Sequence, residues 1–178
     1  MENNIWESVP LGEKAPEVIN VIVEIPKGSN NKYEFDEKLG LFKLDRVFYS
    51  PFFYPLDYGF IPRTRSEDGD HLDALVIGSD PVPLGTLVEA RPIGVLRMID
   101  SGDPDAKILC VQAKNPRFDT IRDIADVEKW QPHLLKEVAH FYGHYKDLQG
   151  KKVDVSAGWG GAAEAKDEIK KAAQSYTK

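Results

Sequence analysis

Three aspartates fall within six residues in the stretch Asp68-Gly-Asp70-His-Leu-Asp73, at the start of the apolar run Leu72 to Ile77. Carboxylates this close repel one another, and hard divalent cations such as Mg²⁺ would make their convergence favourable. On a straight strand Asp73 would face away from Asp68 and Asp70, so the turn-forming Asp-Gly pair must bend the chain. An acidic turn in solvent explains these residues equally well. An EF-hand calcium loop is excluded because Leu72 stands where that loop needs an oxygen ligand.

A second acidic cluster, containing Asp100, Asp103 and Asp105, also falls in a predicted turn between two apolar runs. In an antiparallel meander, successive loops at the same end of a sheet lie close in space. The two acidic clusters are therefore predicted to build one site.

A positively charged side chain is predicted on an apolar strand face. In the expected strand 41–49, Arg46 alternates onto the same face as Phe42, Leu44 and Phe48. A guanidinium in such a place needs an anion. The partner of Arg46 is either a bound anionic ligand or a core carboxylate, or the side chain reaches out to solvent at the strand end. The expected strand 32–36 has a polar face that, taken alone, would point to solvent.

Alternating and helical patterns predict about seven strands followed by helices. The expected strands cover 18–25, 32–36, 41–49, an irregular aromatic stretch at 51–62, 72–78, a bent strand at 86–99, and 107–112. The expected helices are a short one at 120–127 and two longer ones at 132–148 and 162–176. Residues 1–17 are predicted to form an arm that leads into the domain.

Composition narrows the class of protein. A chain of 178 residues with 42% hydrophobic and 29% charged residues predicts one globular domain over residues 1–178. The net charge of −6 argues against a general nucleic-acid or membrane-surface binder. The single Cys110 lies in an apolar segment and is expected to be a buried thiol. The absence of a leader pattern and of a bilayer-length apolar run favours the cytoplasm.

Several short motifs accompany the acidic stretch in a fixed order. They are Val23-Glu24-Ile25-Pro26, Lys32-Tyr33-Glu34, Leu44-Asp45-Arg46, Phe53-Tyr54-Pro55, Asp57-Tyr58-Gly59, Arg91-Pro92-Ile93-Gly94, Asp100 with Asp105-Ala-Lys107, and His144-Tyr145-Lys146. Each motif alone is weak, but together the chain resembles the soluble family I inorganic pyrophosphatases of prokaryotic type over nearly its whole length.

This resemblance implies an α+β, mainly β fold: a small closed OB-like β-barrel with two helices packed outside. It implies hydrolysis of pyrophosphate to two phosphates with several Mg²⁺ ions, or Mn²⁺ or other divalent ions, in a homohexamer. Asp70 would activate the attacking water, and Glu24 would be an acidic partner behind the metal ligands. The metal ligands implied are Asp68, Asp73, Asp105, Asp100 and Glu34. The phosphate contacts implied are Lys32, Arg46, Tyr58, Lys107, Tyr145 and Lys146.

Three residues depart from the family pattern. His71 stands where proline is usual, Ser101 where many bacterial relatives have a second acid, and Gly143 where a glutamate is usual. His71 is expected to point outward without a role. Two other functions compete: an OB-like module that holds single-stranded nucleic acid on aromatic residues, and a phosphohydrolase for nucleotides or phosphate monoesters.

Overall fold

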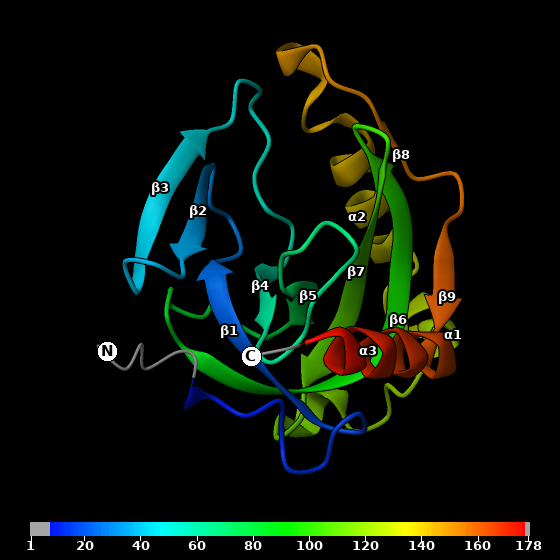
Figure 1. Cartoon of the computed structure of the whole chain (residues 1–178). Helices are drawn as coiled ribbons and strands as arrows, with labels where there is room; N and C mark the ends of the chain where they lie inside the picture. Colours follow the sequence, from blue (N-terminus) through cyan, green and yellow to red (C-terminus); the bar gives the residue numbers. More distant parts are fainter. Residues whose placement is uncertain (1–7, 177–178) are drawn as a thin grey trace.

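The computed structural model describes residues 8–176, which fold into a mainly β structure flanked by helices (Figure 1). Its strands are β1 (Ile19–Ile25), β2 (Asn31–Asp36), β3 (Leu41–Val47), β4 (Asp57–Ile61), β5 (Leu72–Ile77), β6 (Leu87–Asp100), β7 (Asp103–Gln112), β8 (Val153–Asp154) and β9 (Trp159–Gly161). Its α-helices are α1 (Ile124–Trp130), α2 (Leu134–His144) and α3 (Ala162–Ser175), with short 3₁₀ turns at Pro116–Phe118 and Asp147–Gln149.

Five strands close into a ring. Along the sheet the order is β1-β4-β5-β7-β6, and β6 pairs back with β1. Gly59 permits the contact between β1 and β4, because a Cβ there would lie 2.0 Å from the carbonyl oxygen of Ile22. This closed ring with helices outside agrees with the OB-like fold that the resemblance implies.

The two acidic clusters meet by a different route from the one predicted. β5 and β7 are parallel neighbours, with Asp73 opposite Lys107, so the expected antiparallel meander is wrong at this point. β7 also begins at Asp103 and not at residue 107. Only Ser101 and Gly102 form the turn, and both have positive φ, as a two-residue hairpin turn requires. Asp105 is therefore a strand residue held in register, not a loop residue.

The β2–β3 hairpin stands apart from the ring as a separate two-stranded sheet (Figure 1). Phe35 anchors it, because its ring stacks on Phe60 at 5.6 Å and its amide donates to Glu24 Oε1 at 2.8 Å. The apolar face predicted around Arg46 is formed only in part: Phe42 packs on Phe35 and Phe48 is buried, but Leu44 is 55% exposed.

Helices cover two sides of the ring. Phe141 and other apolar residues of α2 pack with Phe48 and Tyr54 in the larger core, and Ile169 of α3 packs in the smaller one, which also holds the buried Cys110. The two longer helices are thus confirmed, although the one expected over 132–148 ends at His144. Part of the arm expected over residues 1–17 lies outside the described residues. No helix within residues 8–176 is long and apolar enough to cross a membrane.

Candidate active site

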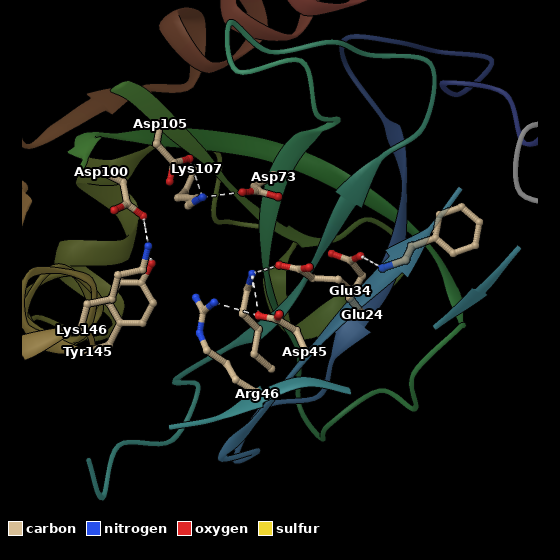
Figure 2. A network of polar contacts seen from close by, with 12 residues as sticks. Glu24, Glu34, Asp45, Arg46, Asp73, Asp100, Asp105, Lys107, Tyr145 and Lys146 are labelled. Carbon is tan, nitrogen blue, oxygen red and sulfur yellow. Dashed lines mark hydrogen bonds and ion pairs between the residues drawn. The ribbon is translucent and has the colours of Figure 1, made fainter. Parts of the chain in front are cut away.

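A cavity of about 590 Å³ opens between the ring, the β2–β3 hairpin and the end of α2. Every residue that the sequence analysis assigned to the site lines it, from Glu24 on β1 to Lys146 just beyond α2. Acidic and basic side chains face one another across this space (Figure 2). The structure thus brings all the predicted residues together, in a cavity where both cations and anions have partners.

The wall formed by β5 and β7 holds a buried ammonium group between two carboxylates. Lys107 forms ion pairs with both Asp73 and Asp105, and its side chain is only 5% exposed (Figure 2). Burial opposes the charge on Lys107, but the two carboxylates outweigh it and raise its pKa. Burial raises the pKa of Asp105, and the nearby Asp73 adds to that effect. This wall carries more negative than positive charge.

The end of the β6–β7 hairpin supplies a second ion pair, between Asp100 and Lys146 (Figure 2). Tyr145 donates a long hydrogen bond of 3.4 Å to the same carboxylate, and Ser101 Oγ donates to it at 2.9 Å. Burial opposes ionisation of Asp100, but its bonds to Lys146 and Ser101 prevail and lower its pKa. Ser101 therefore orients a predicted metal ligand.

The hairpin wall contributes Lys32, which pairs with Glu34 and lies 3.7 Å from the Asp45 carboxylate. Arg46 donates to Asp45 Oδ2 at 2.8 Å (Figure 2). Its Nε is buried and has no hydrogen-bond partner within residues 8–176. The carboxylate beside Arg46 thus comes from its own strand.

Two carboxyl groups in the cavity hold their protons unusually well. Burial raises the pKa of Glu24 to about 8, with a further rise from Asp73. At the exposed mouth, the acidic turn is fixed by a hydrogen bond from the Asp70 amide to Asp68 Oδ1 at 3.0 Å. Partial burial raises the pKa of Asp70, and Asp68 and Asp73 raise it further. Both shifts come first from burial of the carboxyl group and then from neighbouring carboxylates.

Three further residues line the cavity that the sequence analysis gave no role in the site. Tyr142 is 2% exposed, and its hydroxyl has no hydrogen-bond partner in the described chain. Glu37, at the hairpin turn, is bound by Arg65 and lies against His71. The expectation that His71 points outward is wrong, because its ring stacks on Phe60 at 5.0 Å. Nothing in the local pattern distinguished Tyr142 from its apolar helical neighbours.

The donor set suits hard divalent cations, since all the acids offer carboxylate oxygens and several are short of counter-charge. Within residues 8–176 no three acidic or imidazole groups converge closely enough to hold an ion. Lysine ammonium groups lie between the carboxylates instead, as Lys107 does between Asp73 and Asp105. Cation binding would have to displace these ammonium groups, which would leave them available to an anion.

A cavity that pairs carboxylates suited to divalent cations with lysine and arginine groups suited to phosphate oxygens defines a hydrolase site for phosphate compounds. Residues 21–177 match the family model described as inorganic pyrophosphatase, and the chain belongs to that family. The inorganic pyrophosphatase of Geobacillus stearothermophilus is 50% identical over 149 residues, which cover 84% of this chain and 88% of that protein.

Two further relatives extend the match to the whole chain and to the fold. The inorganic pyrophosphatase of Picrophilus torridus is 44% identical over 180 residues, covering 100% of this chain and 99% of its own. The crystal structure of inorganic pyrophosphatase from Thermus thermophilus superimposes with a TM-score of 0.91 at 45% identity, covering 96% of this chain and 98% of that one. The family and fold inferred from the sequence are confirmed.

Proposed function

We propose that this protein hydrolyses inorganic pyrophosphate to two orthophosphates in a Mg²⁺-dependent reaction, with Asp70 as the general base. The observation that carries the proposal is the cavity itself, where acids from β2, β5, β6, β7 and the acidic turn face Lys32, Arg46, Lys107 and Lys146. Pyrophosphate carries several negative charges near neutral pH, and acids alone would repel it. Only a site that holds cations among these acids can take such a substrate.

Divalent cations would be held by Asp68, Asp73, Asp100, Asp105 and Glu34, with Glu24 as an acidic partner behind them. When bound, such ions neutralise the substrate's charge and make water a better nucleophile at neutral pH. Mn²⁺ and other divalent ions fit the same oxygen donors.

The basic side chains would bind the phosphate groups. Lys107 and Lys146, which pair with Asp73, Asp105 and Asp100 in this structure, would turn to phosphate oxygens once those carboxylates bind cations. The planar guanidinium of Arg46 suits contact with two phosphate oxygens, and its buried Nε–H has no hydrogen-bond partner within residues 8–176. Lys32, Tyr58 and Tyr145 complete the set of phosphate contacts, which would steady the charge on the leaving phosphate.

Asp70 would accept the proton of the attacking water. It lies at the mouth of the cavity, and its raised pKa makes it a stronger base than an ordinary aspartate. Asp70→Asn keeps the size and one oxygen but cannot take the proton, so turnover should fall by orders of magnitude while metal binding stays largely intact. Steady-state rates and Mg²⁺ titration of the variant measure the two effects separately. Near-normal turnover would remove Asp70 from this role.

Two competing functions have direct tests. Phosphate release from ATP or a phosphate monoester at rates comparable with pyrophosphate would favour a broader phosphohydrolase. Salt-sensitive binding of an oligonucleotide without divalent ions would favour the nucleic-acid module. We also propose that the chain forms one domain over residues 1–178, acts in the cytoplasm and assembles as a homohexamer. A stable monomer in sedimentation would contradict the assembly.

A further inference from the structure

The acidic turn lies in the segment 62–71, which joins the paired strands β4 and β5. The last residues that face each other in this pairing are Ile61, at the end of β4, and Leu72, at the start of β5. The segment therefore leaves the sheet and returns to it at a single point. Where its carboxylates, Asp68 and Asp70, lie in the cavity depends on how the two strand ends are joined there.

The hydroxyl of Thr64 joins the two strand ends. It accepts a hydrogen bond from the amide of Leu72 at 2.9 Å and donates one to the carbonyl oxygen of Ile61 at 2.5 Å. A hydroxyl can do both at once, because it carries one donor hydrogen and two acceptor lone pairs. The side chain thus links an amide and a carbonyl that belong to facing residues at the end of the strand pair.

Burial makes both of these hydrogen bonds costly to lose. Thr64 and Ile61 are 0% exposed and Leu72 is 2% exposed, so bulk water does not reach these groups. A buried donor or acceptor left without a partner destabilises the fold by its whole desolvation free energy. The hydroxyl of Thr64 is therefore held in place at the base of the acidic turn.

The backbone that leads into Thr64 is strained. Arg63 has a φ of 60°, in the left-handed region that favours glycine. A proline followed by a residue with positive φ, as in Pro62-Arg63, is typical of a type II turn. Such a backbone persists only where neighbouring contacts hold it, and the bond from Thr64 Oγ1 to Ile61 spans this turn.

Hydrogen bonds within the segment connect its base to the two acids. The amide of Ser66 donates to the carbonyl oxygen of Asp70 at 2.8 Å, and the amide of Asp70 donates to Asp68 Oδ1 at 3.0 Å. The amide of Arg65 donates to the carbonyl oxygen of Ala172 on α3 at 2.8 Å and keeps the segment attached to that helix. Because these bonds make one compact turn, a shift at its base moves both carboxylates.

We propose that Thr64 is a positioning residue, whose hydroxyl fixes the base of the acidic turn and so sets the places of Asp68 and Asp70 in the cavity. The inference rests on the proposed hydrolysis of pyrophosphate, in which Asp68 holds a cation and Asp70 accepts a proton. The proposed phosphate contacts stand on other elements, namely the β2–β3 hairpin, β4, β7 and the end of α2. Loss of the hydroxyl therefore affects kcat and Mg²⁺ binding more than KM for pyrophosphate.

Substitutions at Thr64 separate the hydroxyl from the rest of the side chain. Thr64→Val keeps the shape but can neither accept from Leu72 nor donate to Ile61. We expect kcat to fall about tenfold and the dissociation constant for Mg²⁺ to rise about fivefold, while KM at saturating Mg²⁺ changes less than about twofold. Thr64→Ala also lacks the hydroxyl and should behave in the same way. Thr64→Ser keeps the hydroxyl and loses only a methyl group, so it should restore kcat and Mg²⁺ binding to within about twofold of the parent.

Hydrogen exchange supplies a readout that needs neither substrate nor metal. The amide of Leu72 loses its acceptor in Thr64→Val and should exchange faster there. The amides of Ser66 and Asp70 should follow it, and all of these amides should keep the parent's rates in the serine variant. Val127→Ala is the control for a general loss of stability, because Val127 is 0% exposed in α1 and does not line the cavity. It should lower the unfolding temperature without changing kcat, Mg²⁺ binding or exchange in the acidic turn.

Steady-state kinetics, calorimetric titration with Mg²⁺ and hydrogen exchange together decide the proposal. Losses of kcat and Mg²⁺ affinity in Thr64→Val and Thr64→Ala that are absent from Thr64→Ser and Val127→Ala would support it. Parent-like kcat without the hydroxyl, equal losses in the serine variant, or unchanged exchange in the acidic turn would overturn it. If the parent protein releases no phosphate from pyrophosphate, the proposed function fails, and Mg²⁺ binding and exchange alone show whether Thr64 fixes the acidic turn.

Discussion

Removing the ammonium group of Lys107 should destabilise the metal-free protein far more than the protein with Mg²⁺. Lys107→Met keeps most of the side-chain length but leaves Asp73 and Asp105 facing each other without their shared cation. Their side chains are 21% and 17% exposed, so water screens them only in part. The variant thus leaves the negative charge of Asp73 and Asp105 without a neighbouring positive charge, which a bound divalent cation could supply.

The cost follows from the burial of the group. Breaking a buried ion pair costs about 3 to 5 kcal/mol, and the partial exposure of both carboxylates favours the lower figure, about 3 kcal/mol. For a chain of this length that corresponds to a fall of roughly 6 to 12 °C in the unfolding temperature. A divalent ion among the carboxylates supplies the missing charge, so saturating Mg²⁺ should recover most of this loss.

The assay is thermal unfolding of the parent and the Lys107→Met variant, each with excess chelator and then with millimolar Mg²⁺. Lys114→Met is the control, because Lys114 pairs with Glu89 on the surface and its side chain is 83% exposed. That change should cost less than about 1 kcal/mol in either condition. Equal unfolding temperatures for Lys107→Met and the parent in chelator would refute a role for the Lys107 charge in stability. So would a rise in unfolding temperature with Mg²⁺ that is the same for both proteins.

Two other substitutions test groups inside the cavity. Because burial raises the pKa of Glu24 to about 8, the folded metal-free protein keeps a proton there that the unfolded chain loses from about pH 4.5 upward. The free energy of unfolding should therefore fall as the pH rises from about 4.5 to 8, by up to about 1.4 kcal/mol per pH unit. Measured by urea unfolding, Glu24→Gln should flatten this pH dependence. Parallel curves of stability against pH for the two proteins would contradict the raised pKa of Glu24. Tyr142 lines the cavity, and we expect its buried hydroxyl, which has no partner in the described chain, to meet the substrate, so Tyr142→Phe should raise KM for pyrophosphate about fivefold. Stability should rise by about 1 kcal/mol, because a buried polar group without a partner is removed. An unchanged KM would show that this hydroxyl does not meet the substrate.

Most of the site was predictable from the sequence because its residues stand in short motifs with fixed spacing. The carboxylates of Asp68, Asp70 and Asp73 are close in the chain, so a single turn brings them together. Lys107 was expected in a strand and Asp105 in the turn before it, so their spacing of two residues was predictable but their shared strand was not. Only the contacts between motifs that are distant in sequence could not be derived locally, and the family resemblance indicated that these motifs form one site.

The remaining features could not be predicted because they depend on contacts between distant segments. The parallel pairing of β5 with β7 sets Asp73 opposite Lys107, and no local pattern encodes that register. Leu44 is exposed although it shares its parity with the packed Phe42, and strand alternation alone does not indicate this difference. His71 looked like a solvent-facing turn residue because its partner, Glu37, lies 34 positions away in sequence.

We propose that carboxylates and basic groups in this one cavity hydrolyse pyrophosphate with divalent cations. Phosphate release by the purified protein from pyrophosphate, with millimolar Mg²⁺ and then with excess chelator, tests it most directly. We expect rapid release that the chelator abolishes and that added Mg²⁺ restores. Release that persists in chelator, or no release in either condition, would contradict it.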